Sequence, residues 1–169
     1  ATPAMLGLAL GAYGLTQAAL QLPLGWLSDR VGRRPIILLG LSAFIAGSLV
    51  AAYAETLNGI IVGRFLQGCG AIAAALTAMA ADYTRDSQRT KTMAIIGASV
   101  GLSFVIALVL GPVLAAVGGL GLVFMTTAGM GVIGFLLVAL VLPKVPAVQA
   151  STSGAAWQAN HIFGGEQKQ

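Results

Sequence analysis

Five long apolar stretches limit what this chain can fold into more than any other feature of its sequence. They cover residues 5–27, 36–54, 57–81, 92–117 and 120–142. Each is long enough to cross the hydrocarbon core of a bilayer as a helix, which takes about 20 residues. Arg64 is the only Asp, Glu, Lys or Arg within them. The sequence therefore predicts an all-α membrane protein, a polytopic helical bundle with about five transmembrane helices.

Composition supports lipid, and not water, as the solvent of this chain. Hydrophobic residues make up 57% of the sequence and charged residues 8%, whereas a soluble domain has about 25% charged residues. One water-soluble core of 169 residues cannot hide that much apolar surface. A transmembrane β-barrel would show segments of about ten residues that alternate in polarity, and these stretches do not. We expect membrane lipid to be a partner of the chain.

Basic residues lie in alternate connections, and this predicts the orientation. Loops 28–35 and 82–91 and the segment after the fifth stretch carry them, while the loops around Glu55 and at 118–119 have none. The basic residues are Arg30, Arg33, Arg34, Arg85, Arg89, Lys91 and Lys144. By the positive-inside rule, loops 28–35 and 82–91 are cytoplasmic. We expect a multi-pass protein of the cell inner membrane, with a further helix preceding this chain.

Several functional classes are disfavoured. The net charge is +4, but no basic run exceeds two residues, so a nucleic-acid partner is not expected. The chain has one cysteine, Cys69, and one histidine, His161, which leaves no metal-ligand set and no Cys/His or Ser/His pair. We expect no enzyme activity, no cofactor and no metal. Residues 146–169 are polar and predict a flexible tail or linker.

The first loop combines residues that a simple basic loop would not need. Gly25 allows close approach of another helix at the end of the first stretch. Asp29 places an anion in a tight turn near a helix N-terminus. Gly32 supplies a permissive backbone for the reversal. Arg33 and Arg34 are permanent cations that can hold carboxylates or lipid headgroups.

Residues 25–37, with Arg30 among them, resemble motif A of the major facilitator superfamily, G-x-L-a-D-r-x-G-r-r/k-x-x-l. The resemblance implies that the five stretches are helices two to six of that fold. Residues 1–145 would then form part of the N-terminal six-helix bundle. An ordinary positive-inside loop is the alternative, but it would not require Gly25, Asp29 and Gly32 in register.

Two further segments resemble motifs of the same family. Arg64, Gln67 and Gly68 are similar to motif B. A charge within a membrane helix is unfavourable by about 2.5–3.5 kcal/mol, so Arg64 should face a polar cavity or a partner, or else extend to the outer interface. Gly111 and Pro112 are similar to the centre of antiporter motif C, although alanines replace its other glycines.

The resemblance is to the drug/proton antiporter group, and it implies secondary transport by alternating access. The expected function is efflux of small organic molecules coupled to protons, with the missing C-terminal half as partner and no transport by this fragment alone. No Asp or Glu lies within the apolar stretches, so a proton-carrying carboxylate would belong to missing helices. The alternatives are an uptake carrier for a sugar or other metabolite and a non-transporting helical membrane module.

The resemblance also implies roles for individual residues. Asp29, Arg33 and Asp82 would form a charge network that latches the outward-facing state against the C-terminal half, the alternative being unrelated loop carboxylates. Tyr13, Gln17 and Gln21 recur every four residues and so share one helix face. They could line the substrate path or form hydrogen bonds between helices. Small residues spaced by four, such as Gly7 with Gly11 and Gly97 with Gly101, predict close helix packing.

Overall fold

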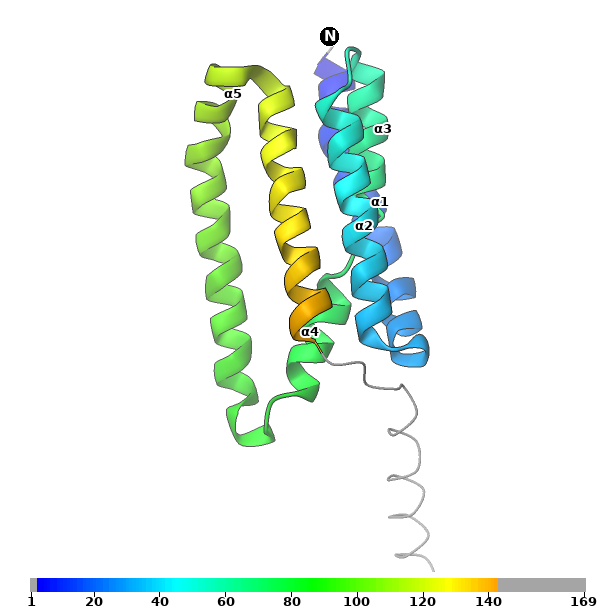
Figure 1. Ribbon diagram of the computed structural model, residues 1–169, viewed down its shortest axis with the longest axis vertical. Helices are drawn as coiled ribbons and strands as arrows, with labels where there is room; N and C mark the ends of the chain where they lie inside the picture. Colours follow the sequence, from blue (N-terminus) through cyan, green and yellow to red (C-terminus); the bar gives the residue numbers. More distant parts are fainter. Residues whose placement is uncertain (1–2, 143–169) are drawn as a thin grey trace, which may run out of the picture.

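The computed structural model describes residues 3–142, which form helices joined by short connections and contain no strand (Figure 1). This confirms the predicted all-α fold. The helices are α1 (Pro3–Val31), α2 (Arg33–Ala52), α3 (Leu57–Gly68), α4 (Ala73–Asp82) and α5 (Arg89–Val141), with a 3₁₀ turn, η1 (Asp86–Gln88), before α5. The tail or linker predicted at 146–169 lies outside the described residues.

Helix α5 reverses direction near its middle. It has 53 residues, which would extend for about 80 Å at 1.5 Å per residue. The backbone is not helical at Gly118 (φ −137°, ψ 19°) and Gly119 (φ 68°, ψ −171°). The positive φ at Gly119 is a conformation that residues with a Cβ rarely adopt. The two legs, 89–117 and 120–141, therefore run in opposite directions (Figure 1).

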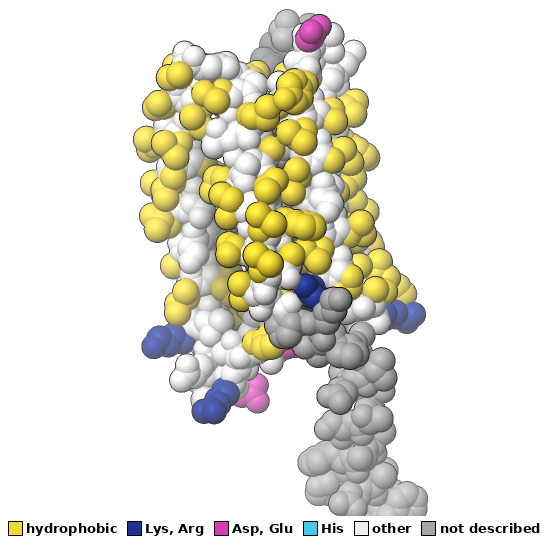
Figure 2. All heavy atoms as spheres, in the orientation of Figure 1, with side chains coloured by type: hydrophobic (Ala, Val, Ile, Leu, Met, Phe, Trp, Pro, Cys, Tyr) yellow, Lys and Arg dark blue, Asp and Glu magenta, His cyan; other side chains and the backbone are white. Residues whose placement is uncertain are grey.

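Within residues 3–142, three stretches are long and apolar enough to cross a membrane, namely α2, Leu57–Asp82 and Asp86–Val141. The last of them contains both legs of α5. Hydrophobic side chains cover the flanks, and most Lys and Arg side chains in view gather at the lower end (Figure 2). We call this the basic end; it carries the α1–α2 turn and the α4–α5 connection. Five separate membrane crossings stay a prediction.

The third predicted stretch, 57–81, is interrupted in the structure. Helix α3 ends at Gly68 and α4 begins at Ala73. Between them the Gly70 N–H donates to the Gln67 carbonyl at 3.0 Å, and the Ile72 N–H donates to the Gly70 carbonyl at 2.7 Å. A Cβ on Gly70 would lie 2.6 Å from the Gly40 carbonyl oxygen of α2. The close approach to α2 accompanies the break and requires glycine at position 70.

Glycine packing is concentrated where α2 crosses α3. A Cβ on Gly63 would lie 2.7 Å from the Ala51 backbone nitrogen, and one on Gly47 would lie 2.4 Å from that of Gln67. Such contacts let the two backbones touch, which drives helix association in lipid. Among the predicted small-residue pairs, Gly7 with Gly11 and Gly97 with Gly101 have open space around them within residues 3–142, so close packing is not seen at these two pairs there.

Candidate functional site

The turn between α1 and α2 is a single residue, Gly32. Its φ is 108°, and its N–H donates to the Ser28 carbonyl at 3.1 Å. The buried Ser28 hydroxyl donates to the Gly25 carbonyl at 2.6 Å. Because α2 starts directly after Gly32, Asp29 at the end of one helix faces Arg33 at the start of the next.

Arg33 lies between two carboxylates from different parts of the chain. Its Nη1 is 2.8 Å from Asp29 Oδ1, and its Nε is 2.5 Å from Asp82 Oδ2 at the end of α4. The side chain of Arg33 is 23% exposed, but those of Asp29 and Asp82 are 60% and 56% exposed. Exposed ion pairs contribute only about 0.2–1 kcal/mol each. The arrangement can join three helix ends and can also be broken readily.

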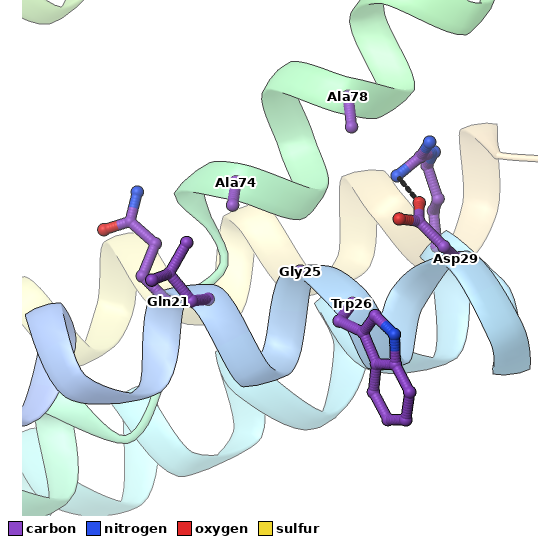
Figure 3. Close-up of a pocket in the computed structure, with 8 residues that line it drawn as sticks. Gln21, Gly25, Trp26, Asp29, Ala74 and Ala78 are labelled. Carbon is purple, nitrogen blue, oxygen red and sulfur yellow. Dashed lines mark ion pairs between the residues drawn. The ribbon is translucent and has the colours of Figure 1, made fainter.

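An open groove of about 310 Å³ runs between α1 and α4 and reaches this ion pair (Figure 3). The helices meet at Gly25, where an added Cβ would lie 3.3 Å from the Ala74 Cβ. Trp26 points away from α4 (Figure 3). The lining residues are Gln21, Leu22, Gly25, Trp26, Asp29, Arg33, Ala74 and Ala78.

The other two arginines of the loop make different contacts. The Arg30 guanidinium lies 3.9 Å from the centre of the Trp26 ring. Arg34 Nη2 donates to the carbonyl of Ala139, near the end of α5, at 2.7 Å. Of the predicted latch residues, the structure therefore brings Asp29, Arg33 and Asp82 together and directs Arg30 and Arg34 elsewhere.

Arg64 is the first group in a chain of polar side chains within the bundle. Its Nη1 donates to Gln67 Oε1 at 3.3 Å, Gln67 Nε2 donates to Ser48 Oγ at 2.7 Å, and Ser48 Oγ donates to the Phe44 carbonyl at 2.7 Å. Gln67 and Ser48 are 2% and 0% exposed. The Arg64 guanidinium lies 4.8 Å from the centre of the Tyr13 ring. Within residues 3–142 both ion pairs belong to Arg33, so Arg64 has no carboxylate partner there.

The part of α1 that carries Tyr13, Gln17 and Gln21 packs against α3 and α4 at successive points. A Cβ on Gly68 would lie 2.6 Å from the Tyr13 carbonyl oxygen and 3.2 Å from the Gln17 nitrogen. Gln21 lines the α1–α4 groove nearer the basic end. Gly111 and Pro112 lie apart from this face, on the first leg of α5, where Gly111 has open space around it.

Ser48 is a residue that sequence reasoning did not select. It lies within an apolar stretch, beside a glycine, and its partner Gln67 is 19 residues away. A hydroxyl in an apolar stretch is a weak signal, because most such groups bond to their own helix. Its importance comes from the packing of α2 against α3, which buries both side chains.

The Ser48 contact gives a stability prediction. Ser48→Ala leaves the buried Gln67 amide without its acceptor, so it should lower the free energy of unfolding by about 1–3 kcal/mol. Ser42→Ala is the matched control, because Ser42 is on the same helix, is exposed and bonds only to the Leu38 carbonyl. Thermal unfolding in detergent should show a lower Tm for Ser48→Ala alone. Equal Tm values for the two variants would contradict the predicted role of the buried chain.

Comparison with known proteins finds a family match over most of the chain. The family profile described as Major Facilitator Superfamily matches residues 1–163. The chain is 50% identical over 144 residues to "Inner membrane transport protein YajR" of Escherichia coli K12, which covers 85% of this chain and 32% of that protein.

More distant relatives include two resistance proteins. "Multidrug resistance protein MdtL" of Klebsiella pneumoniae is 31% identical over 156 residues, covering 90% of this chain and 40% of that protein. "Tetracycline resistance protein, class B" of Escherichia coli is 38% identical over 114 residues, covering 67% of this chain and 27% of that protein. The chain spans about a third of the length of the curated relatives it matches. This all-α, multi-pass membrane chain belongs to the major facilitator superfamily.

Proposed function

We propose that this chain forms part of the N-terminal half of a secondary transporter that moves small organic molecules across the inner membrane. The observation that carries the proposal is the position of Arg33 between Asp29 and Asp82, at the end of the bundle where the loop arginines gather. A static membrane bundle has no evident need for a weak, exposed link of this kind. Relatives named as an inner membrane transport protein and as resistance proteins support the same reading.

The small free energy of the Arg33 ion pairs suits a contact that forms and breaks between two conformations better than one that holds the fold together. Two exposed ion pairs together contribute about 0.4–2 kcal/mol. This is similar to the coupling free energy of about 1–3 kcal/mol that typically links two sites in an allosteric protein. In the proposed mechanism, two halves rock around a central site, and the network favours the outward-facing state by docking against the C-terminal half. Loops 28–35 and 82–91 then face the cytoplasm.

We further propose that transport is efflux and that it is coupled to protons. The resistance proteins among the relatives support the direction. Arg64 lacks a carboxylate partner within residues 3–142, which suits pairing with an acidic group on another helix. Arg64, Tyr13 and Gln17 would then contribute to the polar surface that the substrate or proton meets.

Asp29→Asn tests the switch in the protein expressed from its complete reading frame. The change removes the charge that faces Arg33 while keeping side-chain size, so we expect transport to fall by up to about fivefold, which corresponds to the loss of one exposed ion pair, with normal insertion. Efflux of a fluorescent drug from cells provides the readout. Asp86→Asn is the matched control, since Asp86 lies in η1 and makes no ion pair in the described residues. Normal efflux by Asp29→Asn would refute the switch.

Gln17→Leu tests the proposed path. An apolar side chain of similar size removes the amide while keeping the helix surface filled, so a residue that contacts substrate should show a raised KM or lowered kcat. The measurement is initial efflux rate against substrate concentration. Unchanged kinetics with a lowered Tm would favour hydrogen bonding between helices as its role.

A further inference from the structure

Arg33 and Arg34 are adjacent in the chain but contact different helices. Arg33 contacts the ends of α1 and α4 through Asp29 and Asp82. Arg34 reaches across to the last turn of α5, where its Nη2 donates to the Ala139 carbonyl at 2.7 Å. These two partners are 105 residues apart in the chain. The contact therefore depends on tertiary structure and not on local sequence.

The Ala139 carbonyl cannot be paired within its own helix. In an α-helix the carbonyl of one residue accepts from the N–H four positions later. For Val138 that donor is the N–H of Leu142, at 3.2 Å. For Ala139 the donor would come from residue 143, which is proline and has no backbone N–H. The carbonyls at the end of any helix lack helical donors, and Ala139 is the one in α5 whose donor position falls on this proline; a carbonyl that is shielded from water and unpaired is unfavourable.

We propose that Arg34 replaces the N–H that Pro143 lacks, and so fixes the end of α5 to the start of α2. The Arg34 side chain is half-buried, and its Nε is buried without a partner among the residues the structure describes. A guanidinium placed there is unfavourable unless its other N–H groups are used, because a buried donor without an acceptor keeps its desolvation penalty. The bond to Ala139 compensates for that placement.

The contact adds to the packing interface between α2 and the second leg of α5. At the far end of α2, a Cβ on Gly121 would lie 3.1 Å from the Ala52 carbonyl oxygen. In the middle, a Cβ on Gly131 would lie 2.9 Å from the Ile45 side chain. Arg34 holds the same two helices at the basic end. With Arg33 beside it, the start of α2 joins α1, α4 and α5, which would let this part of the proposed transporter rock as one body.

Hydrogen–deuterium exchange of the last turn of α5 tests the proposal in the protein expressed from its complete reading frame, in lipid nanodiscs. Arg34→Met should make the amides of residues 138–142 exchange about tenfold faster, because the turn opens locally more often. Arg30→Met is the matched control: it removes the same charge from the same loop, but Arg30 contacts Trp26 and not α5. Exchange there should stay at the wild-type rate.

Pro143→Ala provides the decisive second variant. It supplies the missing N–H, so in the Arg34→Met background it should return exchange of residues 138–142 to near the wild-type rate. If Arg34→Met does not accumulate in the membrane, restored accumulation on adding Pro143→Ala supports the proposal equally. Failure of Pro143→Ala to restore either property, or wild-type exchange in Arg34→Met, would overturn it. Since exchange is measured without substrate, the outcome is independent of whether Asp29→Asn lowers efflux.

Discussion

Lipid offers no hydrogen bonds, and this constraint governs how the described part of the chain is built. Each polar group within the apolar zone must find a partner in the protein itself. The buried amide of Gln67 therefore bonds to Ser48, which in turn bonds to the backbone of α2. At the basic end, packing and not lipid keeps water from the buried Gly32 and the half-buried Arg34, and there the Gly32 N–H donates to the Ser28 carbonyl and Arg34 donates to the Ala139 carbonyl.

The ion pairs at the basic end are not subject to this constraint, because water reaches their charged groups. The carboxylates of Asp29 and Asp82 are each more than half exposed, so their pairing with Arg33 adds little to stability. A weak link between helix ends is of more use in a protein that must change conformation than in one that must stay rigid. Tight glycine contacts between α2 and α3 hold the bundle together, and the basic end is left free to respond.

Much of the fold was predictable from the sequence, because apolar stretches of membrane length leave few alternatives to helices. The reversal at Gly118 and Gly119 falls where two glycines separate two such stretches. The break between α3 and α4 was not predictable, since it accompanies a contact of Gly70 with Gly40 on another helix. In the site, the pairing of Asp29 with Arg33 follows from their spacing across a one-residue turn. The partners of Ser48 and Arg34 are 19 and 105 residues away and emerge only from packing.

The central claim is that opposite charges at positions 33 and 82 hold the ends of α2 and α4 together. Reversing the charges tests it most directly, and Asp29 must be reversed as well because it also pairs with Arg33. The measurement compares the proposed transport in Arg33→Asp, in Asp29→Arg with Asp82→Arg, and in the variant that combines all three changes. If the attraction itself matters, the first two variants lose transport and the combined variant recovers a substantial part of it, because opposite charges face each other again. A combined variant no more active than the other two would contradict the account.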